Sequence, residues 1–192
     1  MIDQTSINPH PQKGALVLVV GPSGSGKDTL IGLARKQLAQ DTRFVFPRRV
    51  ITRVAHIDAE DHDTLTPEDF ETAQRAGHFA LHWGAHGLFY GLTKESLSPV
   101  MNGSTAVINV SRSVIANAEA LNVRVTVLSV KCRPTLLAQR IAKRGRESAD
   151  DILLRLKREA PINVTTARLI EIINETDPHD VIADVVEAIR TA

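Results

Sequence analysis

The chain has 192 residues and a mass of 21.0 kDa, which is the size of one α/β domain. Hydrophobic residues make up 43% of it and charged residues 23%, and this composition excludes a mostly disordered protein. Lys and Arg together number 23 and Asp and Glu 22, so a formal charge of +1 gives no reason to expect a nucleic acid as partner. The single cysteine, Cys132, excludes an internal disulfide and a cysteine-based zinc cage.

The N-terminal region has no pattern typical of a targeting segment. Its longest apolar run, residues 15–20, is far too short to span a bilayer, and no charged segment followed by a long apolar core is present. We therefore expect a cytoplasmic protein without a membrane partner. Residues 1–13 are polar and contain two prolines, so we expect a flexible leader there and one domain over residues 14–192. No pattern indicates the oligomeric state.

The first half of the chain predicts a strand, a turn and two helices. Residues 15–20 (ALVLVV) are continuously apolar and rich in β-branched residues, as in a strand buried on both faces. A glycine-rich turn follows, and apolar residues then recur at helical spacing over residues 30–38. Residues 44–62 are mixed and predict irregular structure or short strands. Thr66 caps a helix that has proline at its first position and ends at Gly77.

The second half predicts strands that alternate with helices. Residues 105–110 and 123–130 are expected to be buried strands, with a helix near residues 114–121 between them. Pro134 begins a helix to about Arg144, a second capping signature at residues 148–151 begins another, and a strand at 168–173 precedes the closing helix from Asp177. This alternation predicts the α/β class, with a parallel sheet flanked by helices on both faces.

The glycine-rich turn carries the strongest functional signal. Residues 21–27 (GPSGSGK) match G-x-x-x-x-G-K directly after a strand and directly before a helix, as in a phosphate-binding loop (P-loop). Backbone N–H groups of such a loop face the bound anion, and Lys27 would reach the outer phosphates. We expect the nucleotide to be bound by Gly21, Pro22, Ser23, Gly24, Ser25, Gly26, Lys27, Asp28 and Thr29.

Asp28 departs from the pattern, which has serine or threonine after the lysine to ligate Mg²⁺. A carboxylate is itself a good oxygen ligand for Mg²⁺, either directly or through water, and its charge beside phosphates requires a metal between them. Thr29 would point about 100° away on a helix. We therefore expect Asp28 to face the metal.

The P-loop and the segments after it resemble the guanylate kinase branch of the nucleoside-monophosphate kinases over about residues 15–190. The matching elements are Ile51-Thr52-Arg53 (a T-T-R element), residues 65–70 (LTPEDF), 77–79 (GHF), 87–91 (GLFYG), 140–145 (RIAKRG) and 155–156 (RL). The resemblance implies a P-loop NTPase fold with a small acceptor-binding insertion, at about residues 44–93, and an arginine-bearing lid, at about residues 140–158.

Departures from the guanylate kinases concern the acceptor. Leu81 stands where those enzymes have the glutamate that reads guanine, and His62 and His56 replace a tyrosine and an arginine of the phosphate grip. Arg53 and Tyr90 of that grip remain. A leucine side chain cannot hydrogen-bond to the polar groups of a base, so the resemblance implies a phosphorylated acceptor without a base that must be recognised.

A closer resemblance explains these departures. V-I-T-R from Val50, H-W-G-A-H-G-L-F-Y-G from His82 and R-G-R-E from Arg144 are similar to the ribose 1,5-bisphosphate phosphokinase family. It implies transfer of the terminal phosphoryl group of ATP, with Mg²⁺, to a phosphorylated sugar, ribose 1,5-bisphosphate, giving 5-phosphoribosyl 1-diphosphate. The alternatives are a guanylate kinase proper, a non-catalytic guanylate-kinase-like module, which would commonly lack Lys27, and a regulatory NTPase.

Basic residues gather between residues 131 and 158, which hold nine basic and three acidic side chains. Phosphoryl transfer needs cations around the moving group, and a solvated basic face is the alternative. The resemblance assigns catalytic roles to Lys27, Arg140, Arg144 and Arg155. It assigns acceptor binding to Arg53, Tyr90 and Arg146. Asn109 and Arg112 follow the strand at residues 105–110, at the carboxyl end where α/β sheets bind their ligands, so we expect them to bind the acceptor as well.

Several assignments leave a second interpretation open. Arg146 would face a second phosphate or pair with Glu147, and Ser111 would cap a helix beside Asn109 and Arg112. Asn174 stands where related kinases contact adenine, and an ordinary turn at a strand end is equally compatible. Five of the seven histidines lie within residues 56–86, but without a completing ligand set we favour acceptor contacts or polar surface over zinc.

Overall fold

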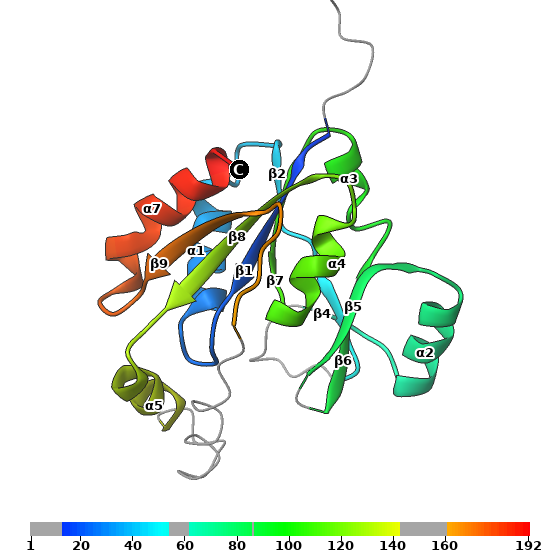
Figure 1. The fold of residues 1–192 in the computed structure, drawn as a ribbon, viewed down its shortest axis with the longest axis horizontal. Helices are drawn as coiled ribbons and strands as arrows, with labels where there is room; N and C mark the ends of the chain where they lie inside the picture. Colours follow the sequence, from blue (N-terminus) through cyan, green and yellow to red (C-terminus); the bar gives the residue numbers. More distant parts are fainter. Residues whose placement is uncertain (1–12, 54–61, 86, 143–160) are drawn as a thin grey trace, which may run out of the picture.

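A computed structural model describes residues 13–53, 62–85, 87–142 and 161–192 (Figure 1). Its main sheet has five strands in the order β2-β7-β1-β8-β9, and every neighbouring pair is parallel. The strands are β1 (Ala15–Val20), β2 (Phe44–Val45), β7 (Thr105–Asn109), β8 (Arg124–Lys131) and β9 (Arg168–Ile173). The predicted α/β class with a parallel sheet is confirmed.

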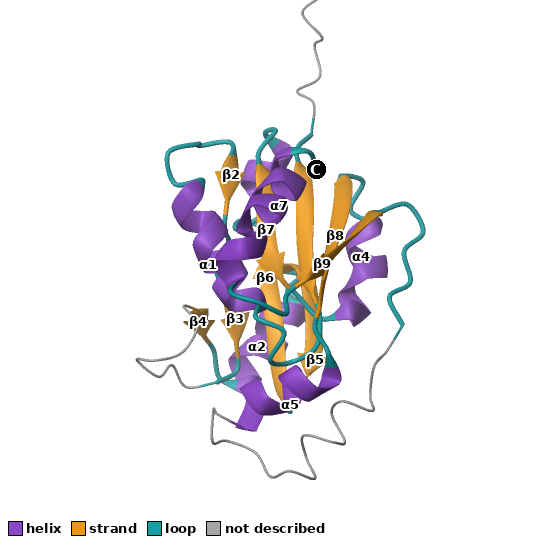
Figure 2. Cartoon of the chain, turned by 90° about the vertical axis from the view of Figure 1, so that its left-hand side faces the viewer, coloured by secondary structure: helices purple, strands orange, loops and turns teal. Residues whose placement is uncertain are grey.

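Helices cover both faces of this sheet, as the alternation predicted (Figure 2). Leu16 and Leu18 of β1 belong to the apolar cluster on the side of α4 (Ile115–Glu119). Val17, between them, belongs to the cluster on the side of α1 (Lys27–Gln37) and α7 (Pro178–Arg190). Successive residues of a strand point to opposite faces, so a central strand covered on both faces must be apolar throughout, which explains the unbroken ALVLVV run.

The remaining helices lie near the ends of the strands. A short 3₁₀ helix, η1 (Arg112–Val114), follows β7 and leads into α4, and α3 (Ser98–Met101) precedes β7. The helix α5 (Pro134–Ala142) follows β8 at the same end of the sheet as the P-loop. Asp177 caps α7, because its side chain accepts a hydrogen bond from the His179 backbone N–H at 2.9 Å.

A second sheet stands beside the main one and was not predicted as a sheet. Its order is β4-β3-β6-β5, with β3 (Arg49–Ile51), β4 (His62–Thr64), β5 (Phe79–Ala85) and β6 (Leu88–Thr93). The strands β5 and β6 form an antiparallel hairpin, and β3 pairs antiparallel with β6. At Gly91 the ring of Phe79 passes so close that a Cβ would lie 2.5 Å from it. Short mixed segments of this kind escape a search for continuous apolar runs.

The helix α2 (Pro67–Arg75) covers the outer face of this second sheet through Phe70, which stacks on Phe79 with ring centroids 4.5 Å apart. Its predicted cap is confirmed, because Thr66 Oγ1 accepts a hydrogen bond from the Asp69 backbone N–H at 3.1 Å. Insertion, main sheet and P-loop are thus arranged as in the predicted class of fold.

Glu119 fixes the segment that leads into β9. Its Oε1 accepts hydrogen bonds from the backbone N–H groups of Thr165, Thr166 and Ala167, each at 2.8 Å. These donors favour the ionised carboxylate and lower the pKa of Glu119 from its ordinary value of 4.5. The carboxylate therefore links the end of α4 to a segment 46 residues later in the chain.

Several predicted features lie outside the described residues. They are the N-terminal leader up to residue 12, the capping signature at residues 148–151, His56, His86, and the three arginines Arg144, Arg146 and Arg155. Within the described part of the chain, no helix is long and apolar enough to cross a membrane.

Candidate active site

The P-loop lies between the carboxyl end of β1 and the first turn of α1. Gly24 and Gly26 have φ angles of 82° and 89°, a left-handed conformation in which side chains are strained. The loop therefore curls back on itself at the positive end of an 11-residue helix, where backbone N–H groups can face an anion.

Lys27 is folded over this loop. Its Nζ donates hydrogen bonds to the carbonyl oxygens of Gly21 and Pro22, each at 2.9 Å. The ammonium charge is therefore held at the phosphate-binding turn instead of extending into solvent. Thr29, also among the predicted nucleotide-binding residues, is exposed on α1.

Asn174, directly after β9, is hydrogen-bonded to the P-loop. The side chain is fully buried, and its Nδ2 donates a hydrogen bond of 2.7 Å to the Ser25 carbonyl oxygen. A Cβ on Gly26 would lie only 2.3 Å from the same Nδ2, so the glycine is needed for this approach. The sequence offered Asn174 only as an adenine-side or turn residue, since its partner is 149 positions away.

Arg140 lies against the same loop end. It donates hydrogen bonds to the carbonyl oxygens of Asn174 at 3.0 Å and Thr176 at 3.5 Å, and to Cys132 Sγ at 3.7 Å. Burial is the largest influence on the Cys132 thiol and raises its pKa, which keeps the thiol protonated at neutral pH. Of the three predicted catalytic lid arginines, Arg140 is the one that the described residues contain, and it lies beside the P-loop.

Asp28 and Asn109 meet across the neighbouring strand ends. Val19 of β1 is paired in register with Asn109 of β7, and Asn109 Nδ2 donates a hydrogen bond of 2.6 Å to Asp28 Oδ1. In P-loop proteins the metal is usually held by a serine or threonine of the loop and a carboxylate on a neighbouring strand. Here the carboxylate stands on the helix and the neutral amide on the strand. An oriented, exposed carboxylate oxygen suits Mg²⁺, so the donor chemistry fits this metal.

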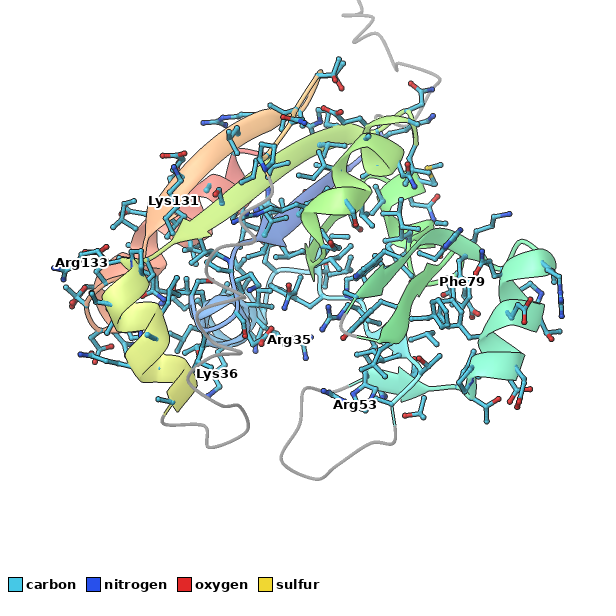
Figure 3. The ribbon with its side chains drawn as sticks, turned by 60° about the horizontal axis from the view of Figure 1, so that its bottom comes forward. Arg35, Lys36, Arg53, Phe79, Lys131 and Arg133 are labelled. Atoms are coloured by element: carbon cyan, nitrogen blue, oxygen red, sulfur yellow. The ribbon has the colours of Figure 1, made fainter. Side chains whose placement is uncertain are left out.

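The inner face of the second sheet carries the predicted acceptor residues. Tyr90 of β6 stacks on Trp83 of β5, with ring centroids 5.4 Å apart and planes inclined by 7°. The Arg53 Nε is buried and has no hydrogen-bond partner among the described residues. In Figure 3, Arg53 lies at the edge of the second sheet turned toward α1. Leu81 is 2% exposed and belongs to the apolar core.

A second arginine on this face was missed by the sequence analysis. Arg49, the first residue of β3, donates a hydrogen bond from Nη1 to the Asn109 carbonyl oxygen at 3.0 Å, and its Cζ lies 5.4 Å from the Tyr90 ring centroid. In the sequence, an arginine directly before two apolar residues indicates at most the start of a strand, so nothing marked Arg49 as a site residue. Arg112 begins η1 just after β7 and is half-buried.

Histidines do not form a metal centre in the described residues, where no group of three metal-binding side chains comes together. His62 is buried in β4, and its Nε2 lies 3.3 Å from the Arg53 carbonyl oxygen. His82 lies in β5 and not on a helix.

Comparisons with known proteins agree with this geometry. A family model described as Zeta toxin matches residues 1–190. The chain is 45% identical over 162 residues to a ribose 1,5-bisphosphate phosphokinase PhnN of Brucella melitensis, covering 84% of each chain. It is 48% identical over 149 residues to a protein of the same name from Methylobacterium radiotolerans, covering 78% of this chain and 84% of the relative.

A solved structure supports the fold alone. A guanylate kinase from Anaplasma phagocytophilum matches with a TM-score of 0.68 at 17% identity, over 94% of this chain and 86% of that one. The predicted P-loop fold of the guanylate kinase type is thereby confirmed.

Proposed function

The chain belongs to the Zeta toxin family and, by its relatives, to the ribose 1,5-bisphosphate phosphokinases, and from this premise we propose which of its residues bind the phosphoryl donor and which bind the acceptor. The enzyme transfers the terminal phosphoryl group of ATP to ribose 1,5-bisphosphate and produces 5-phosphoribosyl 1-diphosphate and ADP. This assignment rests on the 45% identity to the Brucella melitensis phosphokinase over 84% of both chains, together with a P-loop that retains its lysine.

The donor side of the reaction belongs to the P-loop and its neighbours. Residues 21–29 bind the phosphates of ATP, and Lys27 turns from the Gly21 and Pro22 carbonyl oxygens toward them. Asp28, oriented by Asn109, would hold Mg²⁺ directly or through water. When bound, the metal neutralises charge that develops on the phosphate oxygens.

The acceptor side belongs to the inner face of the second sheet. Arg53 and Tyr90 bind the phosphate that receives the phosphoryl group, and Arg112, at the start of η1 after β7, contributes a further cation. Leu81 offers no polar atom to a base, which suits a sugar phosphate better than a nucleotide. A nucleotide would lose about 1–3 kcal/mol for each polar edge group left unpaired.

In the transfer, an oxygen of the acceptor's 1-phosphate bonds to the terminal phosphorus of ATP, and the bond from that phosphorus to the bridging oxygen breaks. The bridging oxygen leaves with ADP. One P–O bond thus forms as another breaks, and no oxidation or reduction takes place. Lys27 and Arg140 lie at the donor end of this path, and Arg144, Arg155 and Arg146 complete the cationic surroundings in our proposal.

The test compares acceptors under identical conditions. Purified protein with ATP and Mg²⁺ receives ribose 1,5-bisphosphate or GMP, and mass spectrometry follows the products, with Lys27→Ala as the control for contaminating kinases. We expect ribose 1,5-bisphosphate to be used about a hundredfold better or more, as two or three unpaired groups on GMP would require. Comparable efficiencies would refute the assignment, and use of GMP alone would identify a guanylate kinase.

A further inference from the structure

Asn174 is a buried polar side chain to which the proposed function gives no role. Its side chain is fully buried, and its Nδ2 donates the 2.7 Å hydrogen bond to the Ser25 carbonyl oxygen. A carbonyl oxygen can only accept, so the amide nitrogen must face Ser25. Asn174 Oδ1 is then buried without a hydrogen-bond partner among the described residues. An apolar side chain would leave no such atom unpaired, so what the buried amide supplies is the hydrogen bond that it donates.

The backbone of Asn174 is fixed on both sides, which holds the side chain against the loop. Its N–H donates a hydrogen bond of 2.9 Å to the carbonyl oxygen of Lys131, the last residue of β8. Its carbonyl oxygen accepts the 3.0 Å hydrogen bond from Arg140 Nη1 on α5. Figure 1 shows the ends of β8 and β9 and the helix α5 at the end of the sheet that carries the P-loop. Asn174 is thus a fixed point to which the loop is attached.

The peptide unit between Ser25 and Gly26 needs such a fixed point, because its own sterics allow two orientations. Rotation of a peptide plane changes ψ of the residue before it and φ of the residue after it, and glycine accepts both signs of φ. Gly26 has a φ of 89° here. A bond that holds the Ser25 carbonyl oxygen therefore selects one of the two orientations.

The selected orientation decides which end of this peptide dipole faces a bound phosphate. None of the peptide bonds in the described part of the chain is cis, and in a trans peptide the C=O and the N–H point in opposite directions. Because the Ser25 carbonyl oxygen points at Asn174, the Gly26 N–H points away from it, at the N-terminus of α1. In the other orientation the carbonyl oxygen would face the anion and repel it.

We propose that Asn174 is a positioning residue for the phosphoryl donor: it holds the Ser25–Gly26 peptide so that the Gly26 N–H faces the phosphates of ATP. The inference rests on the proposed function, in which residues 21–29 bind these phosphates. Asn174 acts through the loop and not by touching the phosphates. Without its amide the peptide is free to turn, and ATP must then reverse that turn or bind with one N–H donor fewer.

The test separates this role from an ordinary structural one. Calorimetry compares wild type, Asn174→Ala and Ile172→Ala in the presence of Mg²⁺, with ADP as the probe, and steady-state assays give KM for ATP and for ribose 1,5-bisphosphate. Ile172 is the matched control, because it lies two residues earlier on β9 in the apolar cluster beside α7, so its truncation weakens the same strand by lost packing. Urea unfolding shows whether each variant is folded under the assay conditions.

Asn174→Ala is expected to raise the Kd of ADP and the KM for ATP by about 10- to 150-fold, the range for one hydrogen bond to a charged group. The KM for ribose 1,5-bisphosphate should change less than about threefold, and Ile172→Ala should change neither nucleotide constant beyond that range. Nuclear magnetic resonance of the wild type supplies the answer if Asn174→Ala does not fold. The Gly26 amide proton should move downfield when ADP binds, because a hydrogen bond to an anionic oxygen deshields it.

Three results would each overturn the assignment of Asn174 and leave the proposed function intact. They are nucleotide constants of Asn174→Ala within about threefold of wild type, an equal loss in Ile172→Ala, and a Gly26 amide that does not respond to ADP. A wild-type protein that binds no ADP in the presence of Mg²⁺ would refute the proposed function instead, and the Asn174 assignment with it.

Discussion

The contact between Gly26 and Asn174 predicts a measurable coupling between two residues far apart in sequence. A Cβ at position 26 would lie 2.3 Å from Asn174 Nδ2, at a φ of +89°. Gly26→Ala should therefore cost about 1–2 kcal/mol for the left-handed backbone. It should also displace the amide from the Ser25 carbonyl oxygen, and that lost buried hydrogen bond adds about 1–3 kcal/mol.

Asn174→Ala alone removes the same 2.7 Å hydrogen bond and should cost about 1–3 kcal/mol. In the double variant the bond can be lost only once. Its total cost should stay near about 2–5 kcal/mol, whereas independent effects would sum to about 3–8 kcal/mol. The expected coupling free energy is therefore about 1–3 kcal/mol, within the range for residues in direct contact.

Urea unfolding of the four proteins measures this coupling, with the fluorescence of Trp83, the single tryptophan, as probe. Gly32→Ala is the matched control, because a Cβ there meets nothing within 4 Å in the interior of α1, and it should stabilise the protein by about 0.5–1 kcal/mol. Costs of Gly26→Ala and Asn174→Ala that add to within about 0.5 kcal/mol would refute the reasoning.

Three further predictions concern charged groups. Lys27→Ala should lower kcat by orders of magnitude and leave the urea midpoint nearly unchanged, since Lys27 is a partly exposed charged residue outside the apolar core; near-normal turnover would contradict the kinase mechanism. Asp28→Ser should weaken Mn²⁺ binding in the presence of ADP, measured by electron paramagnetic resonance. Adding Asn109→Asp to this variant should recover the binding by restoring the usual arrangement, whereas a double variant as weak as Asp28→Ser would place this pair outside the metal site. Glu119→Gln should reduce the loss of stability that the wild type shows at acid pH. Because the folded-state pKa of Glu119 is lowered, its carboxylate contributes fully to the free energy of unfolding above the ordinary pKa of 4.5, and this contribution is lost as pH falls through the folded-state pKa. Wild-type and variant curves of unfolding free energy against pH that run parallel would rule this out.

Features that depend on neighbouring residues could be predicted from the sequence. The strand at residues 15–20, the P-loop and the Thr66 cap are each set by a few consecutive side chains, because strand burial, left-handed turns and capping are local in origin. The class of fold followed from the order of such elements. The kinase family followed from motifs of the same local kind.

The second sheet could not be predicted in this way. Its strands are short, and their pairing depends on which segments meet. The stacking of Tyr90 on Trp83 and the antiparallel pairing of β3 with β6 are settled by register between strands and by cover from α2. Local propensity does not determine such pairings, since each is stabilised by packing across strands.

The chemistry of the candidate site depended most on tertiary structure. Asp28 is 81 residues from Asn109, Arg49 is 60 residues from Asn109, and Asn174 is 149 residues from Ser25. The sequence supplied the residue types, a carboxylate after the P-loop lysine and an amide at a strand end. Only the strand order, with β1 between β7 and β8 and β9 beyond, brings these ends to one edge, where hydrogen bonds of 2.6–3.0 Å decide which side chain orients which.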